Sequence, residues 1–239
     1  MSPFLGEFIG TMLLIILGDG VVANVILDKT KGFNGGLMSI TFGWGMAVFT
    51  GVFTSVKLGG GGHLNPAVTL AMAYLGNLDS SLILTYLAAQ FLGAFAGAVI
   101  VWASYRQHFD ATTNADTKLG VFCTSPSIRH AWQNAWTEIV GTFVLVLGAL
   151  LMTAPESKLG TLDALPVALL VIGIGLSLGG PTGYAINPAR DLAPRFAHFI
   201  LPIRGKRDSD WSYAWIPVIA PIVGAFIAAF IFKLVETGA

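Results

Sequence analysis

The chain has 239 residues, of which 54% are apolar and only 11% are charged, and its 13 basic and 13 acidic residues cancel. Soluble domains carry about 25% charged residues, so the composition argues against a soluble protein. The absence of any block of like charge excludes a nucleic-acid partner, and the single cysteine, Cys123, excludes an internal disulfide.

Six apolar segments approach or exceed the length of about 20 residues that a helix needs to cross a bilayer. In chain order they span residues 4–27, 36–56, 82–104, 134–153, 163–180 and 213–234. No basic stretch precedes the first segment and no cleavage motif follows it, so we expect a retained span and not a signal peptide. Buried helices of a soluble protein would need polar faces, which these segments lack. The sequence therefore predicts an all-α membrane protein with six transmembrane helices.

A shorter helix is predicted between the second and third spans. Asn65, Pro66 and Ala67 begin it, because asparagine before proline is a typical helix start, and Gly76 ends it. About ten residues give a helix of roughly 15 Å, which is half of a bilayer. The Gly-rich segment 59–64 before it is not expected to be helical. Irregular backbone at membrane depth is tolerated only where it lines a cavity or is buried in protein.

A second triplet, Asn187, Pro188 and Ala189, lies between the fifth and sixth spans. It follows the Gly-rich segment 179–186, which is likewise not expected to be helical. Its helix is expected to reach about His198, with an interruption at Pro194. A lone Asn-Pro-Ala would be an ordinary helix cap. Two triplets at matching places predict a pair of re-entrant half-helices whose N-termini meet near the midplane of the membrane.

The two halves of the chain resemble each other. The sequence around Glu7 is similar to that around Glu138, and the sequence around Gly93 is similar to that around Gly224. Both pairs are 131 residues apart, and the triplets are 122 apart. Because each half holds three spans, the second half enters the membrane from the opposite side, which gives two inverted repeats. We expect one transmembrane domain, 1–239, with repeats at about 1–104 and 134–239 and an aqueous loop at 105–133.

Two helix N-termini that face one pore would each present unpaired N–H groups and about half a positive charge. Such a field repels cations, including hydronium, but leaves neutral solutes unaffected. The amides of Asn65 and Asn187 are expected to donate to a passing oxygen, opposite a row of backbone carbonyls. The residues expected to supply these carbonyls are Gly61, Gly62, His63, Leu64, Gly183, Ala185 and Ile186.

On these motifs the chain resembles the aquaporin (major intrinsic protein) family, and within it the glycerol-facilitator, or aquaglyceroporin, branch. The most specific segments are 62–69 and 183–191, which carry the two triplets. The resemblance covers nearly the whole chain and is weakest over 105–130. It implies an aquaporin-like fold, with one pore in each protomer of a homotetramer.

The resemblance also implies a selectivity filter. An arginine within a membrane segment is costly and marks a functional site by default, although a snorkelling side chain at the bilayer rim is the alternative. Arg190 matches the filter arginine of the family, and Tyr184 matches an aromatic wall. Gly175 matches a position that is histidine in water-selective members. Trp44 matches the second aromatic residue if a one-residue gap is allowed, and without that gap the position falls on Gly45.

Two acids lie within the spans at matching places. Glu7 and Glu138 could relay protons, as in coupled transporters, whereas the resemblance implies that each carboxylate holds the loop before a half-helix. Gln90 is expected to serve packing. Asp19, in the first span, has no role that the residues or the family assign.

The functional expectation is a passive channel for glycerol, water and other small neutral solutes that excludes ions and protons. No cluster of histidines or nucleophile–base pair is visible, so neither a metal site, a cofactor nor an enzyme is expected. Alternatives are another main solute (lactic acid, dihydroxyacetone, urea or peroxide) or an inverted-repeat secondary transporter. By the positive-inside rule, the basic residues of the loops would place segment 105–133 in the cytoplasm. The family instead implies cytoplasmic termini in the cell membrane, which is the expectation adopted.

Overall fold

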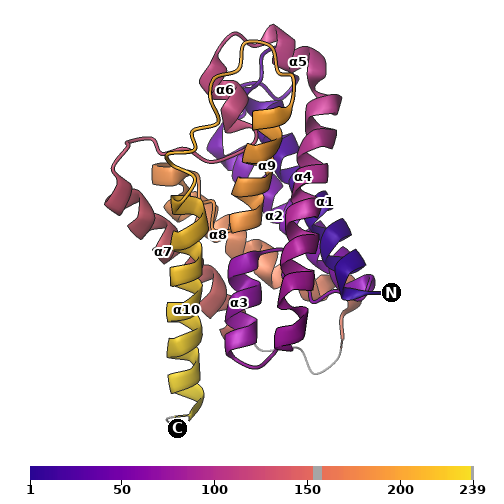
Figure 1. Ribbon diagram of the computed structural model, residues 1–239, viewed down its shortest axis with the longest axis vertical. Coiled ribbons are helices and arrows are strands. Elements are labelled where there is room, and N and C mark those ends of the chain that lie inside the picture. The colour runs from indigo at the N-terminus through magenta and orange to yellow at the C-terminus, as the bar shows by residue number, and fades with distance from the viewer. Residues whose placement is uncertain (153–157, 238–239) are drawn as a thin grey trace.

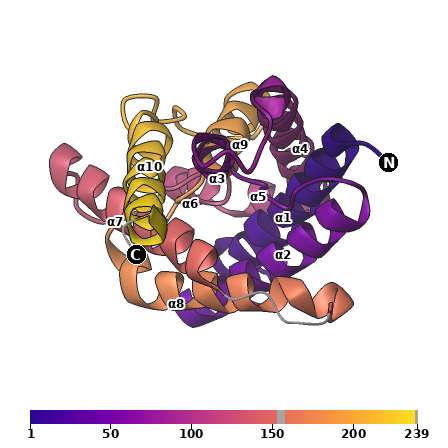
Figure 2. The same cartoon turned by 90° about the horizontal axis from the view of Figure 1, so that it is seen from below.

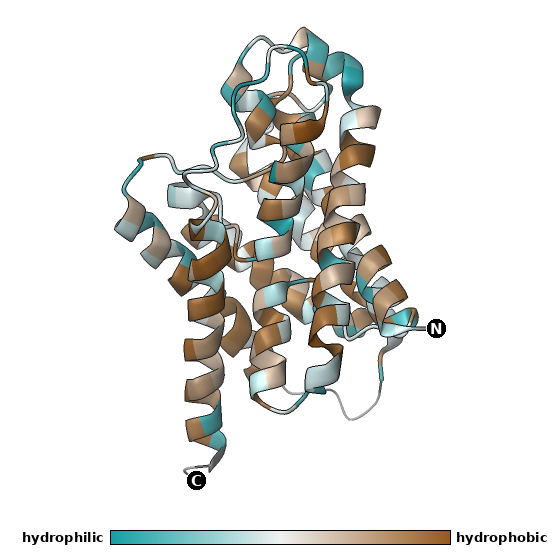
Figure 3. Cartoon of the chain, viewed as in Figure 1, coloured by the Kyte–Doolittle hydropathy of each residue, from teal (hydrophilic) through white to brown (hydrophobic). Residues whose placement is uncertain are grey.

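The computed structural model describes residues 1–152 and 158–237 and is built from helices (Figure 1). The described residues contain six helices that are long and apolar enough to cross a membrane. They are α1 (Pro3–Ile26), α2 (Gly36–Lys57), α4 (Ile83–Ser104), α7 (Ala131–Leu151), α8 (Leu165–Thr182) and α10 (Ile216–Thr237). Figure 3 shows hydrophobic residues along these helices and hydrophilic residues mainly in the connections at their ends. The predicted all-α fold with six membrane-length helices is confirmed.

Two shorter helices, α3 (Pro66–Tyr74) and α9 (Pro188–Ile200), begin at the prolines of the two triplets. Both lie in the middle of the molecule, with α9 above α3 in Figure 1. The expected interruption at Pro194 is wrong, because α9 continues through this residue. A buried ion pair between Asp191 and Arg195, with nitrogen and oxygen 2.7 Å apart, bridges the turn that contains the proline. This contact holds the helix together where proline removes a backbone hydrogen bond.

The Gly-rich segment 179–186 is helical in its first part, which the sequence did not predict. Helix α8 continues through Pro181 and ends at Thr182, and Gly183 caps it with a φ of 80°. Ser127 donates to the carbonyls of Gly180 and Pro181 at distances of 2.8 and 2.9 Å. A distant loop thus satisfies carbonyls that the end of a helix would otherwise leave free.

The segment expected to be an aqueous loop, 105–133, contains two short helices, α5 (Arg106–Ala111) and α6 (Ala115–Gly120). The side chain of Asn114 caps α6 by accepting hydrogen bonds from two backbone N–H groups. Phe109 of α5 and Leu119 of α6 are buried. Two single turns of 3₁₀ helix, η1 (Ser80–Leu82) and η2 (Gly160–Ala164), precede α4 and α8.

The two halves pack in the same order. In the first half α1 lies against α2 and α4, and in the second half α7 lies against α8 and α10. The halves meet where α2 packs on α8, and each half-helix lies against the last span of the other half, α9 on α4 and α3 on α10. Figure 2 shows the half-helices α3 and α9 side by side between α10 and α4. This arrangement is the packing expected of two inverted repeats.

Glycines allow the closest helix crossings. A Cβ on Gly93 of α4 would lie 2.3 Å from the carbonyl oxygen of Phe8 in α1, and a Cβ on Gly224 of α10 would lie 2.3 Å from that of Ile139 in α7. Because backbones meet at these points, no side chain can yield to make room. Small residues that permit close approach are typical of helix packing in membranes.

We expect Gly93→Val to force α1 and α4 apart and to destabilise the protein by about 1–3 kcal/mol or more. The measurement is the melting temperature of the purified protein in detergent, followed by size-exclusion chromatography after heating. Gly20→Ala in α1 is the matched control, because nothing lies within 4 Å of its added Cβ. A Gly93→Val protein as stable as the Gly20→Ala protein would contradict the crossing.

Candidate functional site

A cavity of about 230 Å³ lies inside the helix bundle and separates an apolar wall from a polar one. The polar wall consists of the backbone segments 61–65 and 184–187, which lead into α3 and α9, together with Arg190. The apolar wall comes from α2, α3, α7 and α8. Its side chains include Val48, Val52, Val68, Met72, Val167 and Val171.

Asn65 and Asn187 cap the two half-helices and also tie the two halves together. Oδ1 of Asn65 accepts from the N–H of Ala67, and Oδ1 of Asn187 accepts from the N–H of Ala189. Nδ2 of Asn65 donates 2.8 Å to the carbonyl of Ile186, and Nδ2 of Asn187 donates 2.8 Å to that of Leu64. Each amide group has two N–H donors. One donor therefore serves the opposite loop, and only the second remains for a solute.

The backbone before each half-helix adopts a conformation that side chains disfavour. Leu64, Tyr184 and Ile186 have φ values of 53°, 38° and 44°. Such left-handed conformations cost about 1–3 kcal/mol each and persist only where the surroundings hold them. All three residues line the cavity.

Glu138 holds the second loop. Its Oε1 accepts from Thr182 Oγ1 at 2.6 Å and from the N–H of Ala185 at 3.0 Å, and its Oε2 accepts from the N–H of Ile186 at 2.8 Å. The carboxylate is buried. Burial of a carboxylate is tolerated where donors replace its hydration, so Glu138 is a structural support of the strained loop in this structure.

Glu7 makes the equivalent contacts in the first half. It accepts from the N–H groups of His63 and Leu64 at 3.0 and 2.8 Å, and from Ser55 Oγ at 2.8 Å. Nε2 of Gln90 also donates 2.8 Å to Glu7. The expectation that Gln90 serves packing alone is therefore wrong. Its amide completes the shell of donors around the carboxylate.

Arg190 reaches the cavity from the first turn of α9. Its side chain is 8% exposed, and its Cζ lies 4.2 Å from the centre of the Trp44 ring. A guanidinium over an indole ring is a favourable cation–π contact. The structure brings Trp44, and not Gly45, to the cavity, because Gly45 packs against Ile172 instead.

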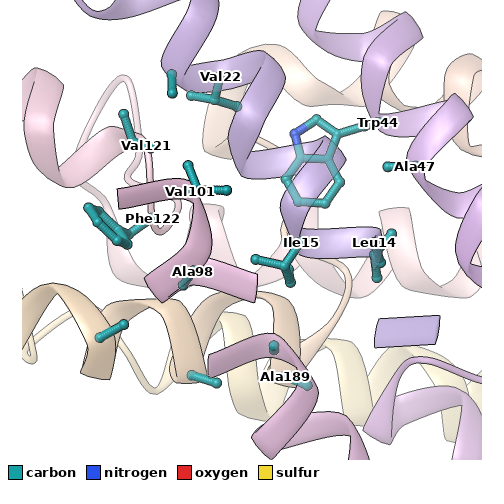
Figure 4. Close-up of a cluster of buried hydrophobic side chains, with 14 of the residues drawn as sticks. Leu14, Ile15, Val22, Trp44, Ala47, Ala98, Val101, Val121, Phe122 and Ala189 are labelled. Atoms are coloured by element: carbon teal, nitrogen blue, oxygen red, sulfur yellow. The ribbon is translucent and has the colours of Figure 1, made fainter. Parts of the chain in front are cut away.

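Helix α1 packs closely against the Trp44 ring. A Cβ on Gly18 would lie 2.2 Å from the ring, so only glycine leaves space for it. Figure 4 shows the indole close to Ile15 and Leu14 of the same helix. The indole is therefore a rigid wall of the cavity.

Tyr184 completes this end of the cavity, and Gly175 makes room for it. A Cβ on Gly175 would lie 2.8 Å from Cζ of Tyr184 and 2.6 Å from Cγ2 of Thr41. The phenol oxygen lies 3.5 Å from Thr41 Oγ1. Gly175 itself is not among the residues that line the described cavity. Its predicted part in the filter is thus indirect, through the position of the tyrosine ring.

Most of the residues that were predicted to supply backbone carbonyls lie together at the cavity. Gly61, Gly62, His63, Leu64, Ala185 and Ile186 line the cavity, as do both asparagines. Gly183 does not; it ends α8 and packs near Thr124. The ring of His63 is held beside Tyr86, with centroids 4.9 Å apart, and its Nδ1 lies 3.2 Å from Thr69 Oγ1.

A buried polar network behind α9 was not predicted. Asp191 Oδ2 accepts from the N–H and Oγ1 of Thr124 at 2.7 Å, and its Oδ1 accepts from Arg195 Nε at 2.9 Å. Arg195 also donates to the carbonyls of Thr124 and Ser209. The signal in the sequence is a pair of opposite charges four residues apart on one predicted helix.

Within residues 1–152 and 158–237, no three His, Cys, Asp or Glu side chains are placed to hold a metal ion. The most deeply buried acids accept hydrogen bonds from backbone N–H groups or form an ion pair with Arg195. Asp19 is an exception.

Comparison with known proteins gives one consistent family. The family profile described as "Major intrinsic protein" matches residues 1–232. The chain is 54% identical to a "Probable glycerol uptake facilitator protein" of Thermotoga maritima, with 98% of this chain and 99% of that protein covered. It is 42% identical to a "D/L-lactic acid transporter" of Lactiplantibacillus plantarum, with 96% and 95% covered. The structure of the aquaglyceroporin from Plasmodium falciparum matches with a TM-score of 0.85 at 34% identity, covering 98% and 96%.

Proposed function

We propose that this chain, which belongs to the major intrinsic protein family and to its glycerol-facilitator branch, is a passive channel for glycerol, water and other small neutral solutes. The observation that carries the proposal is the two-sided cavity. Its polar wall offers asparagine amides, loop carbonyls and a guanidinium, and its other wall is apolar. A polyol has hydroxyl groups and a carbon backbone, so it can satisfy both walls at once.

The two triplets are proposed to exclude ions. The N-termini of α3 and α9 meet at the cavity, where Asn65 and Asn187 are hydrogen-bonded to the opposite loops. Two positive helix ends raise the energy of a cation at this point. A chain of hydrogen-bonded water molecules must also turn here to reach the two asparagine donors, which opposes proton transfer along it.

The choice of solute is proposed to lie with Trp44, Tyr184, Arg190 and, through Tyr184, Gly175. Arg190 can donate to two neighbouring hydroxyls because its donors form a planar fork. The indole of Trp44 and the ring of Tyr184 present carbon to the CH and CH₂ groups of the solute. The loop carbonyls then accept hydrogen bonds from hydroxyls as the solute advances.

A coupled transporter is disfavoured by the two acids that would have to bind the coupling ion. Glu7 and Glu138 are engaged by loop N–H groups and hydroxyls. Protonation of either would remove support from a strained loop. The family consists of channels, which also agrees with the expectation that the chain is not an enzyme.

The chain is a multi-pass membrane protein. We further propose that residues 1–239 form one domain of two inverted repeats, and that the protein assembles as a homotetramer in the cell membrane with cytoplasmic termini. Each protomer holds a complete cavity. Each subunit of the tetramer would therefore have its own pore.

The test is solute flux into liposomes that contain the purified chain, followed by stopped-flow light scattering. We expect glycerol flux to rise linearly with glycerol concentration into the molar range and to be independent of a proton gradient. Saturation at low millimolar glycerol, or dependence on the gradient, would contradict a channel. A parallel series with lactic acid, dihydroxyacetone, urea and peroxide ranks the solutes. Lactic acid ahead of glycerol would replace glycerol as the main solute.

A further inference from the structure

Asp19 lies in the middle of α1, is completely buried, and has no hydrogen-bond partner for either carboxylate oxygen. The buried carboxylates Glu7, Glu138 and Asp191 each accept several hydrogen bonds. An ionised carboxylate without donors is strongly unfavourable in a medium of low dielectric constant. Another charge must offset it if it is to stay ionised.

Arg190, which has the opposite charge, also has a buried polar atom without a partner. Its Nη1 is buried and has no hydrogen-bond partner. Trp44 connects the two residues, because its ring rests on Gly18, the neighbour of Asp19, while the guanidinium lies 4.2 Å from the centre of the ring.

Among the buried carboxylates of residues 1–152 and 158–237, Asp19 is the one whose oxygens have no partner, since Glu7 and Glu138 are engaged by loop donors. Asp191 and Arg195 form a direct buried ion pair at 2.7 Å and neutralise each other. Arg190 and Asp19 are then the two buried charged residues next to Trp44 that each have a polar atom without a partner.

We propose that Asp19 is the counter-charge of Arg190 and a further determinant of selectivity, which keeps the filter from attracting small anions. The helix N-termini and Arg190 that repel cations would otherwise favour anions. Asp19 acts from behind Trp44, does not line the cavity, and leaves the contacts of a neutral solute unchanged. This inference rests on the proposed channel function.

The test compares wild-type protein with Asp19→Asn in liposomes. Nitrate is the probe, because it stays ionised at every working pH. Vesicles in potassium nitrate with valinomycin swell at a rate that nitrate entry limits. We expect Asp19→Asn to raise nitrate entry about tenfold, the scale of one unit charge close to the path at an effective dielectric constant of about 20. Glycerol flux should remain within about twofold of wild type, because a neutral solute does not respond to the net charge of the filter.

Two control variants separate charge from packing. Thr11→Val removes another buried and unpartnered polar group from the same helix without a change of charge, and should leave nitrate entry unchanged. Asp19→Glu keeps the charge and should behave as wild type toward nitrate. If Asp19→Asn does not fold, Asp19→Ser makes the same change of charge with a smaller side chain.

Nitrate entry through Asp19→Asn equal to that of wild type would overturn the inference, because the carboxyl would then be neutral already. A rise in nitrate entry that Thr11→Val reproduces would also overturn the inference, because the cause would then be looser packing of α1 and not the change of charge. Failure of the proposed function itself is distinct. In that case the wild-type protein would carry no glycerol.

Discussion

Replacing Gly175 with histidine is expected to lower glycerol permeability about tenfold or more, for which a rise of about 1.4 kcal/mol in the barrier is enough. The structure gives a specific reason. An added Cβ would lie 2.8 Å from the ring of Tyr184 and 2.6 Å from Thr41. The tyrosine must therefore move, and the cavity is the open space beside it. Water, which needs less room, should lose less permeability than glycerol.

The measurement is the ratio of glycerol to water permeability in stopped-flow experiments on the same vesicles. Gly173→His is the matched control, because it adds the same side chain to α8 two residues earlier, where nothing lies within 4 Å of the new Cβ. If the Gly175→His channel kept the wild-type ratio, the assignment of Gly175 and Tyr184 to the filter would be wrong.

Glu138→Leu is expected to destabilise the protein and to abolish most glycerol flux. The substitution leaves the buried N–H groups of Ala185 and Ile186 without acceptors, at about 1–3 kcal/mol for each group. Ile186 has a φ of 44°, and its carbonyl accepts from Asn65 of the other half. Relaxation of this loop would therefore disturb both triplets.

Thermal unfolding and glycerol flux should be measured together for this variant. Glu138→Gln is the control, because its amide keeps one acceptor oxygen and should give an intermediate loss. Glu7→Leu should act on the first loop in the same way, since Glu7 accepts from His63 and Leu64. A Glu138→Leu protein with unchanged stability and flux would refute the supporting role of these carboxylates.

Much of the fold could be predicted because its signals are local. The six spans follow from length and hydrophobicity, and each observed helix begins and ends within three residues of the expected bounds. The starts of α3 and α9 follow from the order of asparagine and proline. The inverted repeat follows from constant offsets between landmarks, and the structure adds that Gly93 and Gly224 meet matching residues, Phe8 and Ile139.

The details that sequence reasoning missed depend on contacts between distant segments. Gln90 lies on α4, and only the folded chain shows that it donates to Glu7, 83 residues away. Pro194 and Pro181 are breakers by local rules. Both helices nevertheless continue. The Asp191–Arg195 ion pair spans the turn around Pro194, and Ser127 of a distant loop donates to the carbonyls at the end of α8.

The filter was predicted from the resemblance and not from the residues alone. Residue types indicated that Arg190 was costly and therefore functional. They could not show that Trp44 lies beneath it, or that Tyr184 occupies the space that Gly175 leaves open. The register of Trp44 was ambiguous by one residue, and the structure resolves it because Trp44 lines the cavity while Gly45 packs against Ile172.

The most direct test of the account is the glycerol permeability of vesicles that contain the wild-type chain, measured against protein-free vesicles and vesicles with Gly175→His. The account predicts rapid, unsaturated glycerol entry with the wild-type chain and a glycerol signal near that of protein-free vesicles with the variant, while water flux persists in both. Wild-type vesicles that admit water but no more glycerol than protein-free vesicles would contradict it.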